Sequence, residues 1–305
     1  MRKLEEIYLC DPYGDYVKFR INRLPVFTER DFFLIDAHLP GVIISEKFHK
    51  KRACIMTIEL FPSLVQSIKK NGKTIQLFDQ INLEIPIYVF HLLYSIFHTH
   101  WLDNDIYSVH SACVLRNGYA ILLMGHSGVG KTSISLNLLK KYGFKLVCSD
   151  RTLLKLGNDG RLIPIGGTKV VTYKKSNANI SSGMLMAGVK YVDREVKKVI
   201  PKYLAPQYPP KINSIAMVRL SNFSSEIENF LPFEALVALY PCFLDYWNSD
   251  ALLFEGLEIY NGTKINVQIK RKVLAGLRKS ILKTPVVSIS GSLENISRKI
   301  DKLAK

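Results

Sequence analysis

The segment that most constrains this chain is a glycine-rich octapeptide, GHSGVGKT, at residues 125–132. It matches the phosphate-binding pattern G-x-x-x-x-G-K-[ST] at every fixed position. The apolar run at residues 119–124 predicts a buried strand, and the apolar spacing in residues 133–142 predicts a helix that Gly143 ends. The loop is therefore expected to join a strand to a helix N-terminus, which is the setting that a nucleotide-binding loop requires.

The residue types in this loop explain how it would bind a nucleoside triphosphate. Glycines let the backbone approach a phosphate closely, so that successive N–H groups form a nest around the anion. Lys131 can reach the outer phosphates, and the Thr132 hydroxyl can bind Mg²⁺. We expect ATP, or another nucleoside triphosphate, to contact the loop and the start of the helix, which comprise Gly125, His126, Ser127, Gly128, Val129, Gly130, Lys131, Thr132 and Ser133.

Composition leaves two interpretations of the charge open. Of the 305 residues, 42 are Lys or Arg and 26 are Asp or Glu, which gives a net charge of +16. The basic residues are spread along the chain, without an Arg-rich arm or an aromatic RNA-binding motif. The charge is either a general property of a Lys-rich protein or a sign of an acidic partner.

The sequence predicts a cytoplasmic protein without a membrane span. The most apolar stretch, residues 81–101, contains Glu84 and three histidines and is interrupted by Pro86, so it suits a core helix better than a membrane helix. The N-terminus turns acidic at once, unlike a signal peptide. The five cysteines have no paired spacing, which favours free thiols in a reducing compartment.

We expect two regions, an N-terminal subdomain at 1–104 and a nucleotide-binding domain at 105–305. Residues 1 to about 60 are predicted to be β-structure, and a helix is predicted at about 87–100. The strand candidates in this N-terminal region are residues 7–10, 16–21, 41–45 and 53–58.

Turn signals on both sides of the loop predict a mixed sheet. Residues 107–115 read as a strand, and the turn Arg116-Asn-Gly118 would make it antiparallel to the strand before the loop. A second hairpin is expected at 152–165. Later expectations are a strand at 168–173, a mobile loop at 177–183, a helix at 233–244 broken near Pro241 and a hairpin at 256–269. The fold class is α/β in the mixed α+β sense, with helices flanking the sheet.

Five side chains near these elements are candidates for chemistry. Asp150 follows a buried strand, where a carboxylate can accept a proton from a hydroxyl or hold Mg²⁺, although it could also be a turn or cap residue. His110 lies on the preceding strand and is either catalytic or a core histidine. His98 and His100 have a metal-like spacing, but no third ligand is evident, which favours a structural role. For His126, contact with the terminal phosphate and simple exposure both remain open.

The order of these motifs resembles HPr kinase/phosphorylase. The resemblance rests on His110, on the loop at 125–132 and on Leu146-Val-Cys-Ser-Asp-Arg151, where that family has paired aspartates that are often followed by Arg. The wider fold resembles phosphoenolpyruvate carboxykinase. Residues 215–220 and 286–303 also look like stand-alone HPr-kinase-like proteins, among them kinases encoded with lasso peptides.

The resemblance implies roles for a few residues. Lys131 and Thr132 correspond to the family's loop lysine and hydroxyl, and His110 to its histidine. The aspartate pair corresponds to Ser149 and Asp150, or in another register to Asp150 and Arg151, so one carboxylate remains. An acidic residue commonly stands in the family where this chain has His126, and the family's signature for engaging HPr is not found.

These observations predict an ATP-dependent kinase that transfers the γ-phosphoryl group to a hydroxyl. Asp150, His110 and Lys131 would be catalytic, and Thr132 and Asp150 would hold Mg²⁺. The favoured acceptor is a serine of a peptide or protein, which is acidic if the charge is a partner signal. A small hydroxylated metabolite, a nucleotide-binding regulator and a nucleic-acid hydroxyl are the alternatives, in that order. A homo-oligomer is also expected.

Overall fold

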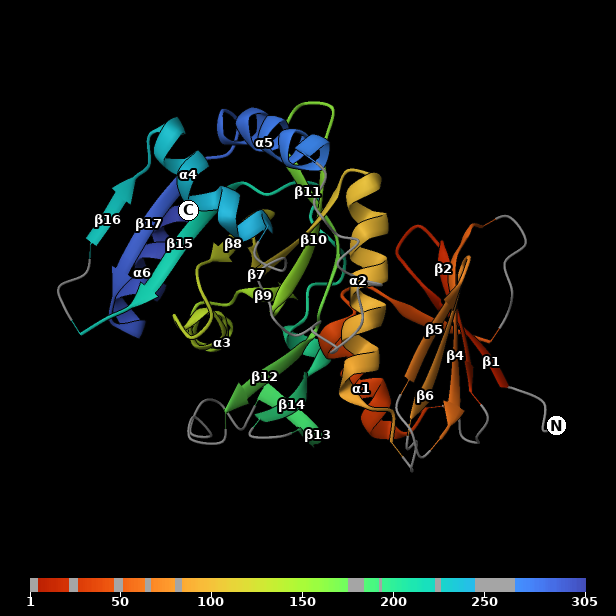
Figure 1. Ribbon diagram of the computed structural model, residues 1–305. Coiled ribbons are helices and arrows are strands. Elements are labelled where there is room, and N and C mark those ends of the chain that lie inside the picture. Colours follow the sequence, from red (N-terminus) through yellow and green to blue (C-terminus); the bar gives the residue numbers. More distant parts are fainter. Residues whose placement is uncertain are drawn as a thin grey trace.

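The computed structural model of the chain shows a mixed α/β protein with three sheets (Figure 1). It describes residues 5–21, 27–46, 52–63, 67–79, 84–174, 184–191, 194–222, 226–244 and 267–305. Six α-helices lie within these residues, and none of them is long and apolar enough to cross a membrane. All five cysteines are free thiols.

The first sheet is built by the N-terminal region and has the strand order β3-β1-β2-β4-β6-β5. Its strands are β1 (Glu5–Cys10), β2 (Tyr16–Ile21), β3 (Ile43–Ser45), β4 (Cys54–Pro62), β5 (Ser67–Asn71) and β6 (Thr74–Asp79). The β-rich character expected for this region is confirmed. The strands pair antiparallel, except that β4 is parallel to both of its neighbours.

One helix in this region was not expected from the sequence. Helix α1 (Glu29–His38) interrupts residues that the strand patterns had assigned to β-structure. It begins with a capping box, in which the Thr28 side chain accepts from the Asp31 backbone and the Asp31 side chain accepts from Thr28. The carboxylate of Asp31 is fully buried, so this cap fixes the helix start firmly.

The predicted helix near residues 87–100 is α2 (Ile87–Asp103), and it joins the two large sheets. It stands between them in Figure 1. Its residues Phe90, Leu93 and Phe97 are buried in the core of the first sheet, which extends to Ile106 and Leu153 of the second. The N-terminal region and the second sheet therefore share one hydrophobic core.

The second sheet has eight strands and carries the glycine-rich loop. Its order is β11-β10-β7-β8-β15-β17-β16, with β9 also paired to β7. The strands are β7 (Ile106–Arg116), β8 (Tyr119–Met124), β9 (Lys145–Cys148), β10 (Arg151–Leu156), β11 (Leu162–Gly167), β15 (Ser214–Leu220), β16 (Glu226–Asn229) and β17 (Val286–Gly291). Strand β8 is antiparallel to β7 and parallel to β15, which confirms the expected hairpin and the mixed sheet.

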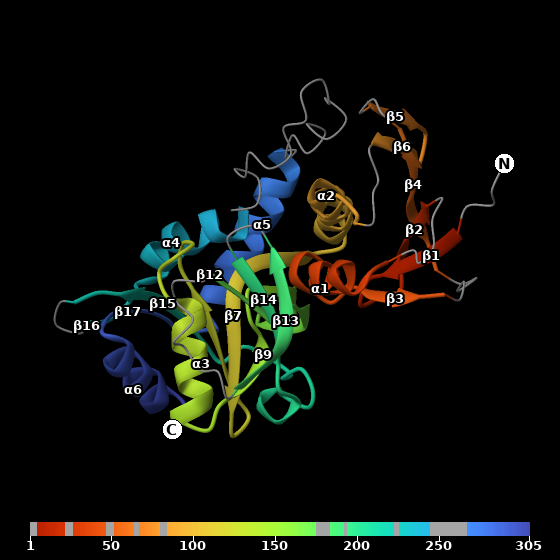
Figure 2. The same cartoon turned by 90° about the horizontal axis from the view of Figure 1, so that it is seen from below.

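Two helices pack on each face of this sheet. Helices α3 (Lys131–Lys141) and α6 (Leu293–Leu303) lie side by side on one face (Figure 2). Helices α4 (Pro232–Leu244) and α5 (Val267–Ile281) pack on the other. Successive buried side chains of each central strand point to opposite faces, so both faces of the sheet are apolar, as expected for a sheet covered on both sides.

Two expectations for the C-terminal half were wrong in part. The helix expected to break near Pro241 runs on to Leu244, because a proline in the last turn forfeits only a single backbone hydrogen bond. The hairpin expected at 256–269 is wrong at residues 267–269, because these residues form the start of the amphipathic helix α5. Residues 256–266 lie outside the described part of the chain.

A small third sheet lies beside the second one. It consists of β12 (Val170–Lys174), β14 (Arg194–Val199) and β13 (Leu185–Tyr191), in that order, followed by a short 3₁₀ helix at Pro201–Tyr203. Strand β12 confirms the strand expected near 168–173. Phe33 and Ala37 of α1 pack on Val170 and Val196 of this sheet. The mobile loop expected at 177–183 lies outside the described residues.

Candidate nucleotide-binding site

The glycine-rich loop connects the end of β8 to the start of α3, as the sequence predicts. Gly125, Gly128 and Gly130 have φ values of +139°, +83° and +100°, which side chains rarely tolerate. Two of them are also closely packed. A Cβ on Gly125 would stand 2.9 Å from the Val218 carbonyl oxygen, and one on Gly130 would overlap the Leu220 side chain. The loop is therefore held against the end of β15.

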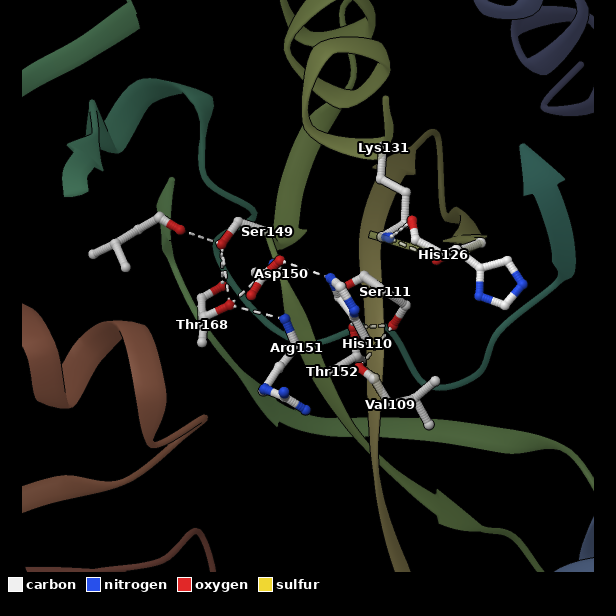
Figure 3. A network of polar contacts seen from close by, with 12 residues as sticks. Val109, His110, Ser111, His126, Lys131, Ser149, Asp150, Arg151, Thr152 and Thr168 are labelled. Carbon is white, nitrogen blue, oxygen red and sulfur yellow. Dashed lines mark hydrogen bonds and ion pairs between the residues drawn. The ribbon is translucent and has the colours of Figure 1, made fainter. Parts of the chain in front are cut away.

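Lys131 lies inside the curve of this loop (Figure 3). Its ammonium donates to the carbonyl oxygens of Gly125, at 2.6 Å, and His126, at 2.9 Å. Only 6% of the residue is exposed. The loop carbonyls thus hold a compact cation at the centre of the loop.

The helix N-terminus beside Lys131 favours an anion. Gly130 caps α3 without a side-chain hydrogen bond, and the first turn has no acidic residue. The first backbone N–H groups and the positive end of the helix dipole are thus left for a ligand. Thr132 and Ser133 are partly buried in this first turn, while His126, Ser127 and Gly128 are exposed. In Figure 3 the His126 ring points away from His110 and Asp150.

The structure brings His110 and Asp150 together. His110 Nε2 lies 3.1 Å from Asp150 Oδ1. His110 is in β7, directly opposite Arg151, the first residue of β10, and the next residue of β7 pairs with Met124 at the end of β8. The pair therefore stands beside the glycine-rich loop. The Asp150 side chain is 40% exposed, so a ligand can reach it.

The charges around Asp150 keep its carboxylate ionised. Burial raises the pKa of this group. The hydrogen bond and charge of His110, followed by the charges of Arg151 and Lys131, lower the pKa by more than burial raises it. The resulting pKa is well below the usual range. Lys131 contributes the smallest of these influences on the pKa of Asp150. An ionised carboxylate can accept a hydrogen bond from a hydroxyl or bind a cation.

Thr168 fixes the backbone at Asp150, and no local sequence pattern indicated it. Its hydroxyl oxygen accepts from the backbone N–H groups of Asp150 and Arg151, both at 3.0 Å. Its backbone N–H donates to the Arg151 carbonyl, and its own carbonyl accepts from Ser149. Thr168 directly follows β11, 18 residues away along the chain, so only the pairing of β10 with β11 brings it here.

The Ser149 side chain is turned into this network. Its side chain is buried and bonds to Thr168 and to the Val170 carbonyl. In the described part of the chain, Asp150 is consequently the acidic residue that the strand end offers to the site.

Arg151 links the site to the N-terminal region. Its Nη1 donates to the Tyr94 hydroxyl at 3.2 Å, and its guanidinium lies 4.8 Å above the Tyr94 ring. Tyr94 in turn donates to Ser108, at 2.7 Å, and stacks on His98. This contact, too, had no signal in the sequence, because it joins residues 57 positions apart.

The two histidines with metal-like spacing have different surroundings. His98 is buried, and burial together with the charge of Arg151 lowers its pKa to about 3, so it is neutral. His100 lies 3.2 Å from Asp15 in the N-terminal region. Among the described residues, no three His, Cys, Asp or Glu side chains form a metal-binding group.

Replacing His110 with alanine is expected to raise the pKa of Asp150. The substitution removes the main influence that lowers this pKa, while burial, which raises it, remains. The pKa of Asp150 is lower in the folded wild type than in the unfolded chain, where it is about 3.9. The contribution of this carboxylate to the free energy of unfolding is therefore present above about pH 3.9. It is lost as the pH falls through the folded pKa, and in the variant this loss should occur at higher pH. Carbon-13 NMR titration of the Asp150 carboxyl measures the shift.

The matched control for this titration is His100→Ala, which removes a histidine–aspartate contact between α2 and the N-terminal region. It should leave the Asp150 titration unchanged. An unchanged titration in His110→Ala itself would show that His110 does not control this carboxylate.

No known family model matches the sequence, and no curated protein matches it at a significant level.

Proposed function

We propose that this protein is an ATP-dependent kinase with a phosphoenolpyruvate carboxykinase-like nucleotide-binding domain of the HPr-kinase-like type. The observation that carries the proposal is the partly exposed Asp150 carboxylate, which lies 3.1 Å from His110 at the strand end beside the glycine-rich loop. A phosphate-binding loop alone indicates only that a nucleotide binds. A carboxylate beside it supplies what phosphoryl transfer to a hydroxyl needs in addition.

In this proposal the loop binds the triphosphate and stabilises its charge. The backbone N–H groups at the start of α3 and the Lys131 ammonium act on the phosphate oxygens. The partly exposed Asp150 carboxylate and the Thr132 hydroxyl fit a Mg²⁺ ion, because Mg²⁺ typically uses one or two protein oxygens and fills its other positions with phosphate oxygens and water. When bound, this ion would neutralise charge on the phosphates.

Asp150 then acts as the base. As the acceptor oxygen bonds to the γ-phosphorus, the bond from that phosphorus to the β-phosphate oxygen breaks and ADP leaves. The hydroxyl proton passes to the Asp150 carboxylate and from there to solvent. His110 orients the carboxylate through their hydrogen bond at 3.1 Å. The hydrogen bonds from Thr168 keep the strand end in place during the reaction.

The proposed acceptor is a serine of a peptide or protein, in a cytoplasmic setting that suits five free thiols. The net charge of +16 would favour an acidic acceptor. A small hydroxylated metabolite is the second choice, and a nucleic-acid hydroxyl, suggested only by charge, is less favoured. One observation favours a nucleotide-binding regulator instead: Ser149 is turned inward, which leaves a single carboxylate.

Incubating the protein with γ-labelled ATP and a lysate of its own cells tests the proposal. We expect the label on a peptide or protein, in a linkage that survives acid and is released by alkali, as a serine phosphoester is. Lys131→Met serves as the control and should give about a hundredfold less of this label, or lower still. Hydrolysis of ATP without any labelled product would instead support the regulator.

A further inference from the structure

Arg219 of β15 lies between two residues that hold the glycine-rich loop. On one side, the Val218 carbonyl packs against Gly125. On the other, the Leu220 backbone N–H donates to the Val129 carbonyl at 3.0 Å, and the Leu220 side chain packs against Gly130. The backbone of Arg219 is therefore fixed beside the loop.

Arg219 and Asp150 stand on opposite sides of the loop. In the sheet, β8 has β7 on one side and β15 on the other. His110 of β7, with Asp150, belongs to the first side, and Arg219 belongs to the second. Val218 and Leu220 are packed in the core under α3, so the alternation of a strand directs Arg219 to the other face of the sheet.

The guanidinium of Arg219 is available to a ligand. The residue is exposed, and its side chain has no ion pair or hydrogen bond with any residue in the described part of the chain. Other arginines of this sheet have protein partners: Arg116 pairs with Asp301, and Arg151 binds Tyr94. A guanidinium carries a permanent charge and matches the oxygens of a phosphate in a bidentate manner.

We propose that Arg219 is a second cation of the nucleotide site and binds the part of the nucleotide that is not transferred, at its α- and β-phosphates. The inference rests on the proposed function. If Asp150 takes the proton of the acceptor, the γ-phosphate faces β7. The remaining phosphates and the nucleoside then leave the loop on the β15 side, where Arg219 stands.

This placement predicts an effect on binding and not on chemistry. A contact to phosphates that are present in both ATP and ADP stabilises the ground state and the transition state equally, so it acts on affinity and leaves the transfer step unchanged. The opposite holds for Asp150. The two residues would thus divide binding and chemistry between the two sides of the loop.

Arg219→Gln tests the inference. We expect the affinities for Mg-ADP and Mg-ATP, measured by calorimetry, to fall together by about tenfold to a hundredfold, the range of one charge-assisted contact. Single-turnover transfer at saturating ATP should stay within a few-fold of the wild type. Arg278→Gln, which removes an exposed cation from α5, is the charge-matched control and should change neither quantity.

Three results would overturn the inference. Loss of ATP affinity without loss of ADP affinity, or a slower transfer at saturation, would place Arg219 on the γ-phosphate. Unchanged affinities would make it a solvated surface residue. Measurements on the wild-type protein distinguish a wrong inference about Arg219 from a wrong proposed function. A protein that binds nucleotides but transfers nothing still tests Arg219, whereas one that binds no nucleotide overturns both.

Discussion

Asp150→Asn is expected to bind Mg-ATP to within a few-fold of the wild type and to transfer the γ-phosphoryl group at least about a hundredfold more slowly. A general base contributes about 10²- to 10⁴-fold in rate, or roughly 3–5 kcal/mol of barrier. The amide keeps the size of the side chain and a hydrogen bond with His110, but it cannot take the proton. Single-turnover transfer and calorimetry on one preparation measure both quantities.

Three outcomes assign the role of Asp150. If it chiefly holds Mg²⁺, more Mg²⁺ or Mn²⁺ should partly restore transfer. If it only shapes the turn, thermal stability should fall by about 0.5–2 kcal/mol and turnover per folded molecule should survive. Wild-type transfer in the variant would remove Asp150 from the mechanism and favour the regulator. Asp159→Asn, which removes a charge from the exposed turn between β10 and β11, is the matched control.

Lys131→Met is expected to slow transfer by about a hundredfold or more and to weaken ATP binding. Removing one group that stabilises developing charge typically costs about 10²–10³ in rate. The structure adds a reason to prefer methionine over alanine: the Lys131 stem is buried, and its ammonium binds two loop carbonyls. Methionine keeps the apolar stem, so the fold should suffer less than in Lys131→Ala.

The control for this variant is Lys140→Met, which changes an exposed lysine in the last turn of the same helix. It should alter neither binding nor transfer. Melting curves of the Met and Ala variants at position 131 separate lost function from lost stability. ATP affinity and turnover that both remain unchanged in Lys131→Met would show that the loop does not bind the triphosphate.

The sequence predicted the parts of the fold that depend on local patterns. The glycine spacing placed the loop between β8 and α3, and Asn117-Gly118 predicted the hairpin that makes the sheet mixed. Helix α1 was missed although its capping box could have been read from Thr28 and Asp31, because the neighbouring strand patterns dominated. The start of α5 was misread as a strand, since three residues alone do not distinguish the two periods.

The candidate site was predictable only in part. The loop residues, Asp150 and His110 could be chosen from motif and resemblance, and the structure brings the last two into contact. Thr168 and Tyr94 could not be chosen, because each reaches the site through strand pairing or helix packing over a long separation in sequence. Nor could any pattern show that Ser149 is turned inward, because that depends on its buried partners.

The contact between the glycine-rich loop and β15 has a consequence for how the protein is made. Some 90 residues separate Gly125–Gly130 from Val218–Leu220 in the sequence, yet these segments pack directly on each other. During synthesis the loop emerges from the ribosome well before the strand that supports it, and such distant pairings form late in folding. Under the proposed function, the nascent chain should therefore gain affinity for nucleotide only after residue 220 has been added.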